Sequence, residues 1–310
     1  MEHLYSIVIP VFKSTQSLEI LISKLEYMAK EYNYSLEVIF VNDSPLEDTT
    51  VTALEKVRNS YSFVRVLTLH KNQGQQLATL AGMSQATGDF VITMDDDLQH
   101  SPSDIPLLIQ TIQEKKSLDG VFAVPNYLQK KHSLWRNFAS FILKKVDTIF
   151  LKKPKDLMLS SFRILTKDLN KLIVGNYNAM PSVSSLMLNA TNNLESIQVK
   201  HHQRDFDKSN YSLPQLVTLA LNTILHYSSI PLRIMAFVGL LGFIGSMIFI
   251  ISIVIRKLML DIEIPGYAST VTLISFFGGL NLFALGLIGE YLIRVIKEQQ
   301  KMKLSDLIKS

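Results

Sequence analysis

The chain has 310 residues, a formal net charge of +4 and no cysteine. This length accommodates one large domain and an appendage, and the missing cysteines exclude disulfides and thiolate metal sites. The mild charge and the lack of a motif that interleaves aromatic and basic residues argue against nucleic acid as a partner.

The first 125 residues alternate short apolar runs with amphipathic runs. Such alternation is typical of an α/β fold with a mostly parallel, doubly wound sheet and right-handed crossovers. Ser14 or Thr15 is placed to cap the first helix, and Ser101 followed by Pro102 to begin a later one. The expected strands are 5–10, 36–41, 64–69, 90–94 and 120–124; the expected helices are one with Leu18, Leu21, Ile22, Leu25 and Met28 on one stripe, 48–58, 74–86, one that begins at 102, and 133–150.

Three consecutive carboxylates, Asp95, Asp96 and Asp97, directly follow the apolar run 90–94, and Gln99 follows them. Side chains alternate along an extended strand, so Asp95 and Asp97 are expected on one face and Asp96 on the other. Carboxylate and amide oxygens bind Mg²⁺ or Mn²⁺, whose open positions can take the oxygens of a diphosphate. Open α/β sheets bind ligands beyond the carboxyl ends of their strands. The pattern therefore predicts a cation-assisted diphosphate site, and a solvated acidic turn is the alternative.

Two common phosphate-binding motifs are absent from the sequence. There is no G-x-G-x-x-G after the first strand and no G-x-x-x-x-G-K-[ST] anywhere. A dinucleotide enzyme and a P-loop ATPase are therefore poorly supported. Activated sugars are also diphosphates, so a nucleotide-sugar site fits the acidic cluster.

Two long uncharged runs, 234–255 and 265–289, explain the positive mean hydropathy of +0.20. Each reaches about 20 residues, which is enough to cross a hydrocarbon core of roughly 30 Å. They predict two transmembrane helices, and a very hydrophobic buried helix is the alternative. Basic residues flank the pair on its outer sides, so the positive-inside tendency places both long ends in the cytoplasm of a protein integral to the cell membrane. No secretory signal is expected, because the chain enters a strand at once.

This reading divides the chain into four parts. They are a cytoplasmic catalytic domain (1–212), an interfacial helix (213–233), a two-helix transmembrane hairpin (234–290) and a cytoplasmic basic tail (291–310). Residues 297–303 are expected to be solvated or to face lipid. The small residues Gly242 and Ser246 permit close helix approach, so a homo-oligomer is compatible with the spans, but the spacing predicts no stoichiometry.

A family resemblance rests on several motifs in order along the chain. The motifs are Ile7-Val8-Ile9-Pro10-Val11-Phe12, Val41-Asn42-Asp43-Ser44, Lys71-Asn72-Gln73-Gly74-Gln75 and Asp95-Asp96-Asp97-Leu98-Gln99, followed by Arg204 with Ser209 and Tyr211, Pro231-Leu232-Arg233, and Gly289-Glu290-Tyr291 with Arg294. Together they resemble the GT-A glycosyltransferases of family 2, in particular the branch that uses polyprenyl phosphates. The resemblance covers nearly the whole chain.

The resemblance implies roles on the donor side of the reaction. Pro10 and Asp43 would line the nucleoside pocket, with Asp43 accepting from the base. Asp95 would serve the ribose or the metal, and Asp97 with Gln99 would hold Mg²⁺ or Mn²⁺. The nucleotide-sugar site would also include Asp96, Arg204, Ser209 and Tyr211, with Arg204 on the diphosphate of a donor that is expected to be a UDP-sugar. A guanidinium matches phosphate oxygens bidentately, although Arg204 could instead be a surface arginine near Asp205 and Asp207.

The resemblance also implies an acceptor site for the phosphate of a polyprenyl lipid, expected to be undecaprenyl phosphate. Arg136, Ser140 and Arg163 occupy the matching positions, and Arg136 and Ser140 lie one helical turn apart. Either arginine could instead be an ordinary solvated charge. The implied reaction is an inverting transfer in which Asp97, Arg204, Arg136 and Arg163 carry the catalytic work.

The sequence departs from the family pattern at three places. Phe12-Lys13-Ser14 replaces a usual Tyr-Asn-Glu, Asp207 to Tyr211 changes a Gly-x-Ser-Lys-Tyr, and Ser161 stands where some members carry an aspartate. The changed nucleotide motifs keep open a non-catalytic membrane scaffold. A processive polysaccharide synthase is a further alternative, but its Q-x-x-R-W motif is missing, since Trp135 precedes an arginine.

Overall fold

The computed structural model describes residues 3–125, 154, 156–179, 181–199 and 266–309, together with isolated positions between 237 and 255. The chain divides into two compact units, residues 1–212 with 301–310, and residues 213–300. The expected helix 133–150 and the expected interfacial helix 213–233 lie outside the described residues.

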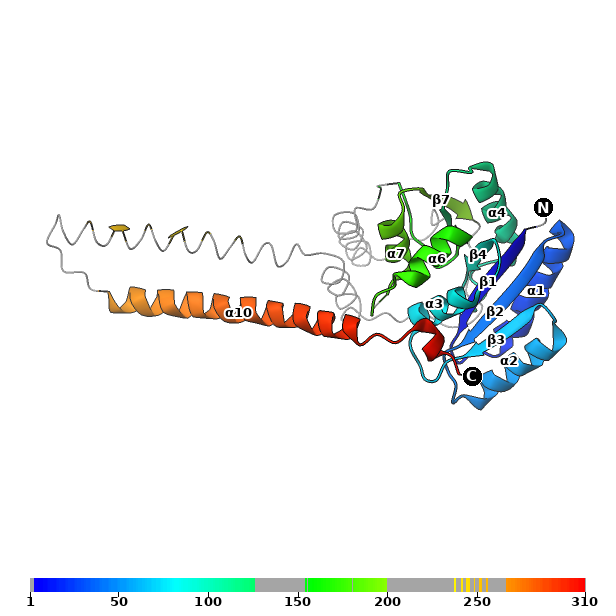
Figure 1. The fold of residues 1–310 in the computed structure, drawn as a ribbon, viewed down its shortest axis with the longest axis horizontal. Helices are drawn as coiled ribbons and strands as arrows, with labels where there is room; N and C mark the ends of the chain where they lie inside the picture. The colour runs from blue at the N-terminus through cyan, green and yellow to red at the C-terminus, as the bar shows by residue number, and fades with distance from the viewer. Residues whose placement is uncertain are drawn as a thin grey trace, which may run out of the picture. The chain divides into compact units, whose positions relative to one another are not determined.

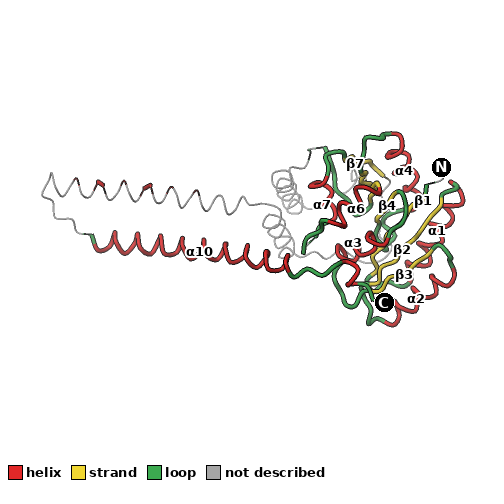
Figure 2. The backbone as a smooth tube through the Cα atoms, in the orientation of Figure 1, coloured by secondary structure: helices red, strands yellow, loops and turns green. Residues whose placement is uncertain are grey.

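A seven-stranded sheet forms the centre of the first unit, in the order β3-β2-β1-β4-β6-β5-β7 (Figures 1 and 2). The strands are β1 (Leu4–Val11), β2 (Ser35–Asn42), β3 (Val64–Thr68), β4 (Phe90–Thr93), β5 (Gly120–Pro125), β6 (Arg163–Thr166) and β7 (Leu194–Val199). Among these strands, β6 runs antiparallel to both its neighbours, and the other pairs are parallel. The predicted mostly parallel α/β sheet is confirmed, although the sequence pattern predicted neither β6 nor β7.

Helices cover both faces of the sheet (Figure 1). On one face lie α1 (Gln16–Tyr32), α2 (Asp48–Ser60) and α4 (Ile105–Glu114); on the other lie α3 (Gln75–Gln85), α6 (Lys167–Gly175) and α7 (Val183–Ala190). Each face has its own cluster of buried apolar side chains. The stripe predicted for the first helix is the buried face of α1.

The predicted helix start, with Ser101 as the cap and Pro102 as the first helical residue, is confirmed, although the first turn is a 3-10 turn. The Ser101 hydroxyl accepts a hydrogen bond from the Ser103 amide, and Pro102 begins a 3-10 turn, η1 (Pro102–Asp104), before α4. Proline is tolerated there because the first backbone N–H groups of a helix have no partner within it.

The order of the strands reverses at β1, which pairs with β2 on one side and with β4 on the other. Val11 is in register with Asn42, and Val8 with Thr93. The carboxyl ends of these three parallel strands therefore meet at one edge of the sheet. Such a switch point is where open α/β sheets leave a crevice for ligands.

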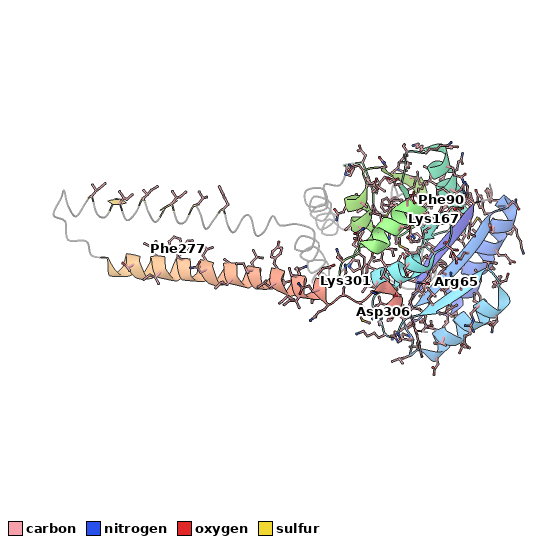
Figure 3. The ribbon with its side chains drawn as sticks, viewed as in Figure 1. Arg65, Phe90, Lys167, Phe277, Lys301 and Asp306 are labelled. Atoms are coloured by element: carbon pink, nitrogen blue, oxygen red, sulfur yellow. The ribbon has the colours of Figure 1, made fainter. Side chains whose placement is uncertain are left out.

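Farther from that edge, a network of hydrogen bonds surrounds Glu37 of β2. Its carboxylate accepts from the Ser6 hydroxyl at 2.6 Å and from Arg65 Nη1 at 2.6 Å. The amide and hydroxyl of Thr87 also donate to it. Figure 3 labels Arg65, whose guanidinium also donates to the Gln85 carbonyl. This network joins β1, β2, β3 and the turn before β4.

The second unit contains α10 (Tyr267–Gln299). From Phe276 onward this helix is long and apolar enough, by length and composition, to cross a membrane, and it is the one helix of the described residues that meets this test. The predicted span 265–289 overlaps it. The other predicted span, 234–255, is described only at isolated positions, so a pair of transmembrane helices stays a prediction.

The last residues of the chain belong to the first unit. After α10, residues 301–309 contain a short 3-10 turn, η2 (Leu304–Leu307). Its Leu304 and Leu307 are buried in the cluster that contains the apolar side chains of α3. Lys301 donates to the Tyr177 carbonyl at 2.6 Å. Lys301, Met302 and Lys303 are exposed, which agrees with the expectation of a solvated segment, although the Lys301 ammonium also bonds the first unit.

Candidate active site

A cavity of about 440 Å³ lies at the carboxyl ends of β1, β2 and β4. Its lining is Pro10, Val11, Phe12, Asp43, Asn72, Gly74, Gln75, Asp95, Asp96 and Asp97. The volume is within the range of small-molecule sites. A somewhat larger hollow of about 540 Å³ lies between α1 and residues 101–103, but its lining includes a single carboxylate, Glu31. The chemistry therefore favours the smaller cavity.

Asp43 holds the loop before α3. Its two carboxylate oxygens accept from the Gln73 amide at 2.6 Å and from the Gly74 amide at 2.9 Å. Gly74 has a φ of +83°, a conformation that glycine adopts without strain. Burial raises the pKa of Asp43, and the two amide hydrogen bonds oppose that rise. If Asp43 accepts a hydrogen bond from the nucleotide base, as predicted, it must therefore use carboxylate lone pairs that the Gln73 and Gly74 amides do not occupy.

Asp95 is held from two sides. Gln75, the first residue of α3, donates through Nε2 to Oδ1 at 2.6 Å, and the Ser161 hydroxyl donates to Oδ2 at 2.7 Å. The Asp95 side chain is 25% exposed. Both donors are neutral, so they fix the orientation of the carboxylate without forming an ion pair with it.

Asp96 also lines the cavity. Its side chain accepts from Ser14, just before α1, whereas that of Asp95 accepts from Gln75 of α3, on the other face of the sheet, so these two side chains point different ways as expected. The strand β4 ends at Thr93, and residues 96–100 form a bend in which Leu98 has a φ of +61°. Among the described residues Asp96 Oδ2 is buried without a hydrogen-bond partner. Burial, with repulsion from Asp95 and Asp97, raises the pKa of Asp96 to about 6, although a hydrogen bond from Ser14 lowers it.

Asp97 and Gln99 lie in the same bend. The Gln99 amide donates to Asp97 Oδ1 at 3.1 Å, which brings the two residues together. No group of three or more histidine, cysteine or acidic side chains in the described part of the chain is arranged to hold a metal ion. Mg²⁺ commonly uses one or two protein carboxylates and completes its shell with water and phosphate oxygens. The predicted set of Asp95, Asp97 and Gln99, together with the buried, unpartnered oxygen of Asp96, fits such a cation, and its ligation stays a prediction.

Arg163 lies in β6 and is 2% exposed. Its Nε donates to the Thr93 hydroxyl at 3.0 Å, and its Nη1 donates to the Ser184 hydroxyl at 2.8 Å. Burial lowers the pKa of Arg163 to about 10, and the charge of Asp95 opposes that shift. The guanidinium therefore stays charged at neutral pH behind Asp95.

The remaining predicted site residues are Arg136, Ser140, Arg204, Ser209 and Tyr211, and all five lie outside the described residues. The structure brings together the predicted donor-side residues Pro10, Asp43, Asp95, Asp96 and Asp97 in one cavity, with Gln99 in the adjoining turn.

Two polar residues of the site had no predicted role. Gln75 belonged to a quoted motif, but nothing in its spacing indicated the hydrogen bond to Asp95. His100 is largely buried, accepts from the Asp95 amide through Nδ1 at 3.3 Å and stacks on Phe162. Burial lowers the pKa of His100, although the nearby acidic groups oppose this shift. Its position directly after the acidic run was the only available signal.

Comparison with known proteins agrees with this geometry. Residues 6–172 match the model of the family described as glycosyl transferase family 2. An undecaprenyl-phosphate 4-deoxy-4-formamido-L-arabinose transferase from Pseudomonas savastanoi pv. phaseolicola is 28% identical over 300 residues, which cover 94% of this chain and 86% of the relative.

Solved structures share the fold at lower identity. Mannosyl-3-phosphoglycerate synthase from Rubrobacter xylanophilus superposes with a TM-score of 0.54 at 13% identity, covering 74% of each chain. Glucosyl-3-phosphoglycerate synthase from Mycobacterium tuberculosis, in complex with Mg²⁺ and uridine diphosphate, gives 0.51 at 14% identity, covering 72% of this chain and 77% of that one. The family match spans more than half of the chain, and this chain belongs to glycosyl transferase family 2.

Proposed function

We propose that this chain transfers a sugar from a nucleotide diphosphate sugar, which we infer to be a UDP-sugar, to a polyprenyl phosphate, which we infer to be undecaprenyl phosphate. One observation carries the proposal. Asp43 and three consecutive carboxylates line one cavity at the switch point of the sheet, in a chain similar along 94% of its length to a protein named as an undecaprenyl-phosphate sugar transferase.

The acceptor needs little help from a general base. Phosphate monoesters lose their second proton near pH 6, so the attacking oxygen is mostly ionised at neutral pH. That oxygen forms a bond to the anomeric carbon, while the bond from this carbon to the diphosphate oxygen breaks and its electron pair leaves with the diphosphate. A single displacement of this kind inverts the anomeric configuration. The task of the protein is then to align the reactants and to stabilise the leaving group.

The described residues suit the donor half of this task. Asp43 fixes the loop 73–74 at the cavity wall, and Gln75 with Ser161 fixes the carboxylate of Asp95. Asp95, Asp97 and Gln99 would hold Mg²⁺ or Mn²⁺, which would neutralise the departing diphosphate. A structural neighbour was solved with Mg²⁺ and uridine diphosphate, which supports this choice of cation and nucleotide.

The proposal also includes contacts that rest on the family resemblance alone. These are contacts of the donor with Arg204, Ser209 and Tyr211, and contacts of the acceptor phosphate with Arg136 and Ser140. For Arg163 we infer a more specific role. Since Arg163 is 2% exposed and its Nε and Nη1 donate to Thr93 and Ser184, it would act on the acceptor through its charge rather than by direct contact.

We also propose that the chain is integral to the cell membrane, with the catalytic domain and both termini in the cytoplasm. Residues before 213 and after 300 belong to one compact unit, so the segment between them must cross a bilayer an even number of times. Exposed large apolar side chains on helical positions support contact with lipid; they include Phe237, Leu241, Ile244, Ile248, Ile251 and Ile255, and Ile274, Phe276, Leu285 and Leu292 of α10.

The test uses the full chain purified in detergent. The chain is incubated with undecaprenyl phosphate, Mg²⁺ or Mn²⁺ and a panel of isotopically labelled nucleotide sugars, and the lipid fraction is analysed by mass spectrometry. We expect one labelled glycolipid, which disappears with a chelator and in Asp97→Asn but persists in Asp48→Asn, a change of an exposed aspartate in the first turn of α2. If the chain shows neither cation-dependent binding of a donor nor turnover with any donor, it is a scaffold and the proposal is refuted.

A further inference from the structure

The segment 301–309 is attached to the edge of the catalytic sheet. The Lys309 amide donates to the Thr68 carbonyl at 2.7 Å, and the His70 amide donates to the Leu307 carbonyl at 3.0 Å. Leu69 and Ile308 form an antiparallel bridge between these two bonds. In Figure 3 the labelled residues Lys301 and Asp306 mark the segment beside the catalytic unit.

The segment is also fixed at its start. Lys301 donates to the Tyr177 carbonyl, its ammonium lies 4.9 Å from the centre of the Tyr177 ring, and the Tyr177 hydroxyl donates to the Met302 carbonyl. Between these two attachments, Leu304 and Leu307 are 5% and 4% exposed. The segment is therefore a packed part of the catalytic unit.

The attachment lies immediately before the loop that builds the donor cavity. β3 is an edge strand of the described sheet, paired with β2 on one side, and 301–309 supply the partner on the other side at its end. The Gln73 amide, three residues after His70, donates to Asp43, and so does the Gly74 amide. The Gln75 side chain then donates to Asp95. Residues 68–70 thus lead directly into the segment that carries these three donors.

We propose that residues 301–309 are a positioning segment for the donor site. By holding 68–70 they keep the Gln73 and Gly74 amides on Asp43 and the Gln75 side chain on Asp95. Gln300 alone separates α10 from Lys301, so the segment is joined covalently to α10, whereas its contacts with residues 68–70 are hydrogen bonds. The claim that residues 301–309 hold the loop does not depend on any ligand. The claim that they affect binding of the donor rests on the proposed function.

The test compares two pairs of substitutions in the full chain. Leu304→Ala with Leu307→Ala loosens the segment, and Leu107→Ala with Leu172→Ala removes two exposed leucines from α4 and α6 as the matched control. Hydrogen exchange is measured at the amides of Gln73 and Gly74 and at those of β1. Affinity for uridine diphosphate with Mg²⁺ is measured by calorimetry.

We expect exchange at Gln73 and Gly74 to be accelerated and uridine diphosphate to bind about tenfold more weakly, with β1 and the control pair unchanged. Leu304→Met with Leu307→Met should restore both values, since the apolar contact is kept. If the segment exchanges freely while Gln73 and Gly74 stay protected, the proposal is overturned. Faster exchange throughout β1 would also overturn it, because the segment would then support the whole fold.

A milder variant covers the case in which the double substitution does not fold. Lys309→Pro removes one N–H donor, and Ile308 already has the extended φ of −90° and ψ of 129° that a following proline favours. The same local increase in exchange is expected, and its absence would overturn the proposal. Failure of the wild-type chain to bind uridine diphosphate would refute the proposed donor, while the exchange measurement still decides whether 301–309 position the loop.

Discussion

The hydroxyl of Ser161 offers a sharp test of how Asp95 works. It donates to Asp95 Oδ2 at 2.7 Å, while Gln75 donates to the other oxygen at 2.6 Å. Ser161→Ala removes the first bond and leaves the second. His100 Nδ1, at 3.8 Å from Oδ2, is too far to replace the hydroxyl by a direct hydrogen bond.

The size of the effect follows from the charge and the exposure of Asp95. A hydrogen bond to a charged group contributes about 1.5–3 kcal/mol. The Asp95 side chain is 25% exposed, so water can replace part of this. We therefore expect a loss of about 1–2 kcal/mol, which is a factor of about 5–30 in the affinity for the nucleotide or in the transfer rate.

The assay is calorimetric binding of uridine diphosphate with Mg²⁺, combined with the transfer rate once a donor is known. Ser160→Ala is the matched control, because the Ser160 hydroxyl accepts from the Phe162 amide and does not contact Asp95. Ser161→Ala combined with Gln75→Ala should show a coupling of at least about 0.5 kcal/mol, since both act on one carboxylate. Unchanged binding and rate in Ser161→Ala, or an equal loss in Ser160→Ala, would refute the reasoning.

Three further predictions concern buried carboxylates, each measured by thermal unfolding of the purified chain. Asp43→Asn should lower stability by about 1.5–3 kcal/mol, because an amide can accept only one of the two backbone hydrogen bonds at full strength. Glu37→Gln should cost about 1–3 kcal/mol at neutral pH, since Arg65 is 43% exposed and part of its charge is screened. Hydrogen bonds from Ser6, Thr87 and Arg65 together outweigh burial and lower the pKa of Glu37, so this difference should be full above pH 4.5 and shrink as the pH falls below that value. Asp96→Asn, without divalent cations, should raise the melting temperature above that of the wild type at pH 7.5. The raised pKa of Asp96, about 6, means that the wild type loses stability as the pH rises from 3.8 through 6, so the advantage should vanish at pH 3.5.

Each of these can fail in a recognisable way. An unchanged melting temperature for Asp43→Asn would mean that Asp43 does not hold the loop 73–74. A cost of Glu37→Gln that does not vary with pH would contradict the lowered pKa. A destabilised Asp96→Asn at pH 7.5 would show that the buried oxygen of Asp96 has a partner in solution.

The core elements of the catalytic unit followed from local patterns. The buried run of β1 and the stripe of α1 have periods of about two and 3.6 residues, which a sequence displays directly. The acidic triplet stood out for a different reason. Three adjacent carboxylates repel one another unless a cation or solvent screens their charge. The strand β6 is as short as β4, but it begins with the charged Arg163 and so lacks the apolar run that indicated β4.

The backbone of the acidic run departs from a continued strand. β4 stops at Thr93 and Leu98 takes a left-handed conformation, and Asp95, Asp96 and Asp97 all line one cavity. The sequence could not predict which groups orient Asp95, because Gln75 lies 20 residues and Ser161 66 residues away along the chain. Contacts across such separations depend on the order of strands in the sheet.

The sequence by itself determined the α/β class, the acidic cluster, the apolar runs and, through ordered motifs, the resemblance to the family, because each is written in residue type and spacing. The tertiary structure decided which side chains fix Asp43 and Asp95, the burial of Arg163 behind Asp95, and the return of residues 301–309 to the edge of β3. These features arise from packing between segments far apart in the chain, and packing depends on where the strands are placed rather than on any local period.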